Sequence, residues 1–168
     1  MRIISRRMAI VSIAAGLACL AVANDSWAER ERQLAGTWML TSNVNTREDG
    51  TKADIFGSNP KGVLILSPDG YFAVVNTRAD LPKFASNNRM KGTAEENKAI
   101  VQGSIALYGR YSVDPKNNLL TLKVESSTWP SWTGTEQKRK YTLKGDELRW
   151  TLAASVGGTA EVAWKRVK

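Results

Sequence analysis

The sequence predicts an all-β fold, an eight-stranded antiparallel up-and-down barrel with one helix inserted between strands 3 and 4. Apolar residues mostly alternate with polar ones, which is the period of a half-buried strand. Turn-forming residues recur at short intervals between these segments. Eight consecutive antiparallel strands can close on themselves, and closure removes the exposed edges of an open sheet.

The first strand is expected at about residues 36–44. Alternation along it places Trp38, Leu40 and Ser42 on one face. Residues 45–61 follow as a long loop that is rich in Asp, Gly, Asn and Pro.

Strands 2 and 3 are expected at residues 63–66 and 71–75. The residues between them read Ser67-Pro68-Asp69-Gly70. Proline fixes one backbone angle of a turn and glycine accepts a positive φ, so this stretch predicts a hairpin.

One helix is expected from Ala94 to about Ile105, after a loop over residues 77–92. Thr93 and Glu96 have the spacing of a capping box, in which each side chain bonds to the backbone N–H of the other residue. The apolar residues at helical spacing, which are expected to pack inward, are Ile100, Val101, Ile105 and Tyr108.

Five more strands complete the predicted barrel, and most of them are joined by tight turns. Their expected ranges are 107–113, 119–125, 136–143, 147–154 and 159–167. A barrel of eight strands is just wide enough to be filled by side chains or to hold one small ligand.

The N-terminal residues predict a secretory signal peptide over residues 1–28. A short basic segment precedes an apolar run that extends to Ala23, and cleavage is expected after Ala23 or Ala28. The barrel domain is then expected over residues 33–168, in the periplasm or outside the cell.

Three other readings of this leader stay open. The apolar run could be a transmembrane anchor, although it is short. Ser5-Arg6-Arg7 is a partial twin-arginine signal. The segment before Cys19 weakly resembles a lipoprotein cleavage box, and a membrane attachment is expected only if Cys19 is lipidated.

The residue types exclude several kinds of chemistry. The chain has no histidine, and its one cysteine, Cys19, would leave with the leader. Zinc sites, thiol catalysis and histidine-dependent triads are therefore excluded for the mature chain, and no catalytic residue, cofactor or metal is predicted.

The net charge of +8 does not predict a nucleic-acid site. In the basic run 138–140, Lys138 and Lys140 alternate with Arg139 and are expected to face water. Aromatic residues that could stack on bases are not interleaved with it.

Several short motifs resemble the lipocalin-like domain family of small bacterial and fungal barrels of the calycin type. The similar segments are Leu34–Trp38, Phe56–Gly62, Ser67–Tyr71, Phe84–Ser86, Gly92–Glu96, Tyr108–Tyr111, Val124–Ser127, Pro130–Gln137 and Trp164–Val167. Together they span about residues 33–167. The resemblance implies a lipocalin-type barrel with a cavity for a small molecule, and it implies no particular ligand.

The resemblance also implies a closure of the barrel by Gly36, Trp38 and Arg166. In calycins the tryptophan of the first strand lies at the closed end, and a basic residue near the end of the last strand stacks across it. Gly36 would permit a close approach there. The alternative is that Arg166 is solvated and Trp38 packs only against apolar neighbours.

Ligand-binding candidates lie in the second half of the chain. Trp129 and Trp132 either cover the mouth of the barrel and touch a ligand or plug that end. Gln137, Arg139 and Tyr141 share one strand face, and their apolar companion Leu143 indicates that this face is the interior.

A buried Arg139 would need a partner, and Glu125 is the nearest candidate. Arg110 is a further polar candidate with aromatic neighbours. This cluster could bind a carboxylate, hydroxyl or carbonyl group of an otherwise apolar ligand, or it could be a structural ion pair.

Three functions remain open from the sequence. The first is a non-catalytic binding protein for a small apolar or amphipathic molecule. The second is a structural or interaction barrel with a filled interior. The third is an isomerase, cyclase or hydrolase that uses Glu125 or another interior carboxylate, with a tyrosine or an arginine as its partner. The oligomeric state is not predicted.

Overall fold

The computed structural model describes residues 32–168. The predicted signal peptide, its cleavage sites at Ala23 and Ala28, and Cys19 lie outside these residues. Export and lipidation therefore stay predictions.

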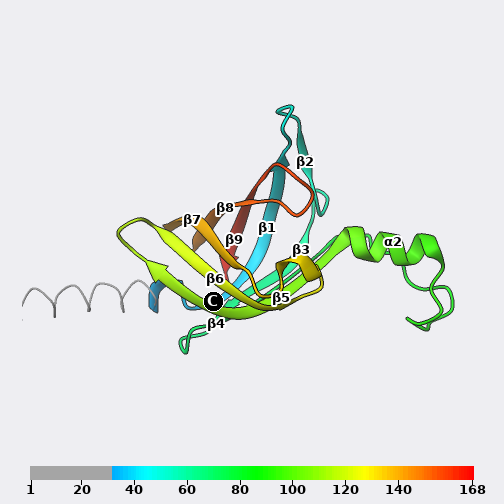
Figure 1. Cartoon of the computed structure of the whole chain (residues 1–168), viewed down its shortest axis with the longest axis horizontal. Coiled ribbons are helices and arrows are strands. Elements are labelled where there is room, and N and C mark those ends of the chain that lie inside the picture. Colours follow the sequence, from blue (N-terminus) through cyan, green and yellow to red (C-terminus); the bar gives the residue numbers. More distant parts are fainter. Residues whose placement is uncertain (1–31) are drawn as a thin grey trace, which may run out of the picture.

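Nine strands form one antiparallel sheet that closes on itself (Figure 1). They are β1 (Gly36–Thr46), β2 (Lys52–Asp54), β3 (Lys61–Leu66), β4 (Tyr71–Thr77), β5 (Ser104–Asp114), β6 (Leu119–Ser127), β7 (Glu136–Lys144), β8 (Glu147–Ala153) and β9 (Thr159–Arg166). Neighbours follow chain order from β3 to β9, and β9 pairs back with β1. The predicted eight-stranded antiparallel barrel is thus confirmed in β1 and β3–β9.

The position predicted for the helix in the strand order is wrong. Helix α2 (Ala94–Gly103) lies between β4 and β5, the fourth and fifth strands, rather than between the third and fourth. The difference arises from β2, whose three residues pair with Val44–Thr46 at the end of β1. Three residues are too few for an alternating pattern to reveal a strand within the predicted loop 45–61.

A bulge in β1 changes which residues face the interior. Trp38 and Leu40 are buried as expected, but the pairing of β1 with β9 shifts register between Leu40 and Ser42. Beyond the bulge the buried residues are Asn43 and Asn45, while Ser42 is only partly buried. The expectation that Ser42 continues the inner face is therefore wrong, because one extra residue inverts the alternation.

The predicted hairpin between β3 and β4 is present. The N–H of Gly70 donates to the carbonyl of Ser67 over 3.0 Å, and the N–H of Ser67 donates to the carbonyl of Tyr71 over 2.8 Å. Gly70 has φ +85°, the left-handed conformation that a glycine provides at such a turn.

The capping box of α2 is also present. The Glu96 N–H donates to Thr93 Oγ1 over 3.2 Å, and the Thr93 N–H donates to a Glu96 carboxylate oxygen over 2.8 Å. The helix ends at Gly103, two residues before the predicted end, because Ser104 already pairs with Thr77 in the sheet.

The expectation that one face of α2 packs inward is wrong. The helix extends away from the end of the barrel (Figure 1), and its one buried residue is Gly103. Val101 is 73% exposed and Tyr108, on β5, is 51% exposed. Within residues 32–168, no helix is long and apolar enough to cross a membrane.

The hydrophobic core fills much of the barrel interior. Its fully buried side chains include Trp38, Leu64, Leu120, Leu122 and Leu148, which come from four different strands. Any site for a small molecule must therefore use the space that these side chains leave.

Candidate functional site

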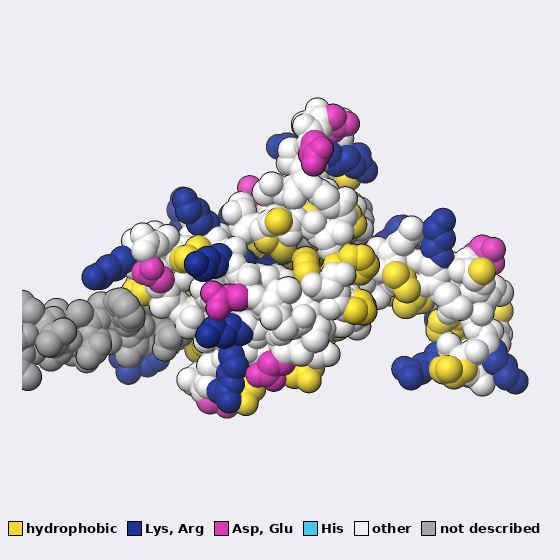
Figure 2. Space-filling view, in the orientation of Figure 1, with side chains coloured by type: hydrophobic (Ala, Val, Ile, Leu, Met, Phe, Trp, Pro, Cys, Tyr) yellow, Lys and Arg dark blue, Asp and Glu magenta, His cyan; other side chains and the backbone are white. Residues whose placement is uncertain are grey.

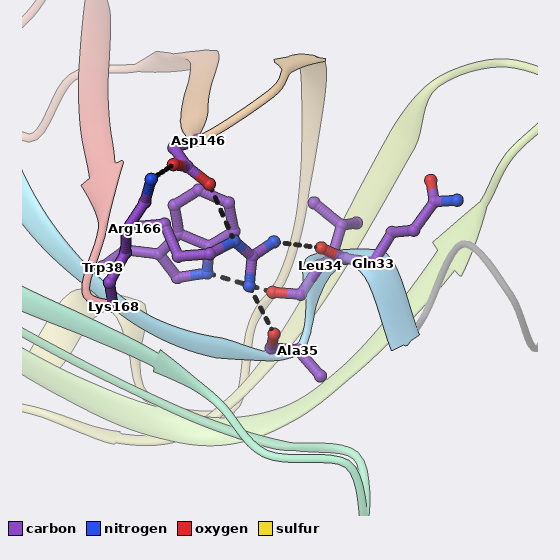
Figure 3. Close-up of polar contacts among 7 residues, drawn as sticks. All are labelled: Gln33, Leu34, Ala35, Trp38, Asp146, Arg166 and Lys168. Carbon is purple, nitrogen blue, oxygen red and sulfur yellow. Dashed lines mark hydrogen bonds and ion pairs between the residues drawn. The ribbon is translucent and has the colours of Figure 1, made fainter.

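One end of the barrel is sealed by a contact between its first and last strands (Figure 3). The guanidinium carbon of Arg166 lies 4.0 Å from the centroid of the Trp38 ring, so the predicted cation–π stack is present. The Trp38 indole N–H donates to the carbonyl of Leu34 over 3.0 Å. Arg166 Nη1 donates to the carbonyl of Ala35 over 2.8 Å.

Arg166 has further partners at this end. Its Nη2 donates to the carbonyl of Gln33, and its Nε lies 3.9 Å from Asp146 Oδ1 (Figure 3). The arginine thus joins β9 to the chain that enters β1.

Gly36 makes this arrangement possible. Its φ is +139°, and a Cβ atom there would lie 2.8 Å from Arg166 Nη1. A side chain at this position would displace the guanidinium group, so glycine is required by conformation and by space.

A cavity of about 50 Å³ lies in another part of the barrel interior, below the end from which α2 extends. Its lining includes side chains with polar atoms from five strands, namely Asn43 of β1, Asn76 of β4, Arg139 of β7, Trp150 of β8 and Trp164 of β9. A cavity needs only about 10–15 Å³ to hold a water molecule, so a few waters or one small polar group fit.

Arg139 is the one charged residue that lines this cavity within the described part of the chain. It is 4% exposed, and its Nη2 donates to Gln137 Oε1 over 2.6 Å. Its guanidinium carbon lies 5.0 Å from the centroid of the Trp150 ring, and Trp150 packs edge-on against Trp164 at 5.3 Å.

No carboxylate of residues 32–168 lies within ion-pair distance of Arg139. Burial therefore acts on the cation without compensation and lowers the pKa of Arg139 to about 9. The guanidinium group remains charged at neutral pH, because that pKa is still well above 7.

Five polar atoms of the cavity-lining residues lack a hydrogen-bond partner among the described residues. Three are N–H donors, namely Arg139 Nε, Trp150 Nε1 and Trp164 Nε1, and two are amide oxygens, namely Asn43 Oδ1 and Asn76 Oδ1. Buried polar groups in proteins nearly always have a partner, so this cavity is suited to a polar guest.

A wider groove of about 350 Å³ adjoins the cavity. Ile55, Phe56, Ile105 and Ser155 line both spaces, while Trp129 lines only the groove. Hydrophobic side chains gather on the surface where the barrel meets α2 (Figure 2). The groove therefore offers an apolar surface directly beside the cavity that contains Arg139.

The structure brings together part of the predicted binding cluster. Gln137, Arg139 and Tyr141 face the interior, and Lys138 and Lys140 face water, as the alternation predicts. Trp132 lines the cavity from the turn η1 (Pro130–Trp132), whereas Trp129 lines the groove and is 42% exposed.

The predicted partnership of Arg139 with Glu125 is wrong. Arg110 and Glu125 both lie on the outer surface, where Arg110 Nε is 4.0 Å from Glu125 Oε1. Arg110 stacks on the Tyr71 ring at 3.6 Å. Alternation along β6 accounts for this placement, because Leu120, Leu122 and Val124 are its buried residues and Glu125 falls on the opposite face.

Sequence reasoning missed the other polar residues of the cavity. Strict alternation through Trp38, Leu40 and Ser42 leaves Asn43 on the other face, because it does not include the bulge in β1. Asn76 lies one residue beyond the predicted end of its strand. Trp150 and Trp164 could have been found, because both occupy alternating apolar positions of predicted strands.

The described residues contain no group of three or more Asp, Glu, His or Cys side chains placed to hold a metal ion. Among residues 32–168, no Asp or Glu side chain lines the cavity or the groove.

Comparisons with solved structures gave barrels of low sequence identity. A redesigned β-barrel is 15% identical, with 82% of this chain and 95% of that chain covered and a TM-score of 0.42. A designed fluorescence-activating β-barrel is 13% identical, with 82% and 96% covered and a TM-score of 0.41. A mutant of the fluorescent protein UnaG is 14% identical, with 81% and 97% covered and a TM-score of 0.38.

A comparison with curated proteins gave no match. The family model of the lipocalin-like domain matches residues 35–167, which is nearly all of the described chain and includes the sealed end, the cavity and the groove. The chain therefore belongs to the lipocalin-like domain family.

Proposed function

We propose that this protein binds a small, mainly apolar molecule without catalysis, in the periplasm or outside the cell. The observation that carries the proposal is the adjacency of the interior cavity and the apolar groove, which share four lining residues. The groove, at about 350 Å³, falls within the roughly 300–1,000 Å³ that small-molecule sites occupy. The predicted signal peptide supports the location.

The site combines an apolar surface with a few polar groups deeper inside. Ile100 and Ile105 contribute aliphatic side chains to the groove, and Phe56 and Trp129 contribute aromatic ones. Arg139 supplies one charge inside the barrel. In ligand sites the apolar surface provides most of the affinity, and the few polar groups fix the orientation.

A second candidate is a structural or interaction barrel that binds nothing. The small cavity volume of about 50 Å³ favours it, since leucine and aromatic side chains fill much of the interior. The enzyme hypothesis has lost the carboxylate that it named, because Glu125 lies on the outer surface beside Arg110.

Native mass spectrometry of the protein purified from its own cell envelope tests the proposal. We expect the wild-type protein to retain a small molecule. An Ile105→Trp variant should lose it, because Ile105 lines both the cavity and the groove. Val75→Trp is the matched control, since Val75 is exposed on β4 between two buried neighbours.

The outcomes separate the candidates. A retained mass that Ile105→Trp abolishes and Val75→Trp preserves supports binding at this site. Bare protein in every preparation, together with no binding of added apolar molecules, would instead favour the filled barrel.

A further inference from the structure

We propose that the interior cavity is a carboxylate subsite, which takes the anionic head group of an amphipathic monocarboxylate whose apolar body lies in the groove. This inference rests on the proposed binding function and names the chemical class of its ligand.

The first argument is the excess of unpaired donors. Arg139 Nε, Trp150 Nε1 and Trp164 Nε1 are buried N–H groups without an acceptor among residues 32–168. A carboxylate has two oxygens that accept several hydrogen bonds and donate none. It is therefore the common organic group that best complements three donors, one of which is cationic.

The second argument is the uncompensated charge. Arg139 is 4% exposed, and the charged groups on its own strand, Lys138 and Lys140, face outward. A buried cation without a counter-charge is costly, whereas a bound anion would turn it into a buried ion pair with further hydrogen bonds. Gln137 Oε1 holds Nη2 at 2.6 Å and so fixes the orientation of the guanidinium group.

The third argument is the division of space. The cavity of about 50 Å³ can hold a head group but is too small for the body of a typical ligand, which needs roughly 300 Å³ or more. The adjoining groove of about 350 Å³ is large enough for that body. A molecule with one small anionic end and one apolar end fits both spaces.

The two unpaired amide oxygens limit the geometry of the head group. Asn76 Oδ1 of β4 lies against β3, where a Cβ on Gly62 would clash with it, and Asn43 Oδ1 belongs to β1, which also pairs with β3. Neither oxygen can accept from a carboxylate, so we place the head group beside Arg139. An accompanying water molecule or a hydroxyl group of the ligand would donate hydrogen bonds to the two amide oxygens.

The test compares probes of equal chain length on the purified full chain. Decanoate, decanol and decylammonium are titrated at pH 7, and binding is followed by the fluorescence of the tryptophans that line the cavity. We expect decanoate to bind at least about tenfold more tightly than decanol and decylammonium to bind least, because only decanoate supplies an acceptor of opposite charge.

An Arg139→Met variant keeps most of the side-chain length and removes the charge. It should weaken decanoate binding at least about tenfold more than it weakens decanol binding. Arg110→Met is the matched control, since Arg110 lies on the outer surface, and it should preserve the preference for decanoate. Arg139→Met should also not lower the unfolding midpoint, because an unpaired buried cation does not stabilise the fold.

Each outcome bears on the proposal. Equal affinity for decanoate and decanol would overturn the carboxylate subsite and leave the proposed binding function standing. A preference for decanoate that survives Arg139→Met would overturn the role of the cavity. Binding of no probe, with only ordered water in the cavity of a crystal structure, would overturn both. The comparison of probes on the wild-type protein decides the matter even if the variant fails to fold.

Discussion

Arg139 and Arg166 lie in different parts of one barrel, and each has its guanidinium group over an indole ring. Arg166 donates to two backbone carbonyls and lies near Asp146, so its charge and its donors are largely satisfied within the chain. Arg139 has one hydrogen bond, to Gln137, and no carboxylate of the described chain beside it. The first arrangement is typical of a structural contact, and the second is typical of a binding site.

The Arg166 contact makes a prediction about stability. Arg166→Lys keeps the charge but loses the planar fork that reaches two carbonyls while stacking on Trp38. We expect the free energy of unfolding to fall by about 1–2 kcal/mol, as measured by urea denaturation. Trp38→Ala should lower the free energy of unfolding by more, about 3–5 kcal/mol, because Trp38 is fully buried.

Arg149→Lys is the matched control, since Arg149 makes only half-exposed ion pairs with Glu147 and Glu161. It should change the unfolding free energy by no more than about 0.5 kcal/mol. Wild-type stability in either Arg166→Lys or Trp38→Ala would show that this contact does not seal the barrel.

At the scale of elements, α2 depends on local hydrogen bonds more than on packing. Its apolar residues face the groove rather than a core, and Val101 is largely exposed. Glu96 accepts from the backbone N–H groups of Ala85 and Thr93, both over 2.8 Å. One carboxylate therefore joins the helix start to the loop that precedes it.

The Glu96 carboxylate predicts a pH dependence of this element. The hydrogen bonds from the Ala85 and Thr93 backbones lower the pKa of Glu96 below its ordinary value of 4.5. A group whose pKa is lowered by folding stabilises the folded form above its unfolded pKa, and the effect is lost as pH falls through the folded pKa. We expect the helix start to loosen below about pH 4.5 while the barrel stays folded.

NMR measures this effect through the amide resonances of Ala85 and Thr93. The titration runs from about pH 2.5 to 7, a range set about the ordinary pKa of a glutamate. Glu96→Gln should remove the titration, whereas Glu95→Gln, which changes the adjacent exposed acid, should preserve it. A titration that is unchanged in Glu96→Gln would show that another group is responsible.

At the scale of the whole molecule, the pairing of β1 with β9 closes the barrel. It extends from Trp38 opposite Arg166 to Thr46 opposite Thr159. Strand β9 also contributes Val162 and Trp164 to the core. Closure and core packing therefore both depend on β9.

A chain that ends at Gly158 should lose its cooperative unfolding transition. Without β9, both β1 and β8 become open edges, and the core loses its largest side chain from that strand. Circular dichroism and tryptophan fluorescence during urea titration measure the loss. Deletion of Lys168 alone removes one exposed contact with Asp146. It should change the free energy of unfolding by no more than about 0.5 kcal/mol. A cooperative transition in the shorter chain would contradict this role of β9.

Features with local signals could be predicted from the sequence alone. The alternation of apolar and polar residues predicted the barrel strands, and the Pro-Asp-Gly turn and the capping box predicted parts of the connections between them. The same alternation along β7 predicted that Arg139 faces the interior. These features could be predicted because each depends on neighbouring residues along one strand or turn.

Contacts between side chains of different strands became known only from the three-dimensional structure. The bulge in β1 brought Asn43 inward, and the short strand β2 changed the strand count. Register between strands and the direction in which α2 leaves the barrel depend on contacts between residues far apart in sequence, which no local pattern encodes. Arg139 was therefore predictable as a buried cation, but its lack of a carboxylate partner became visible only in the closed barrel.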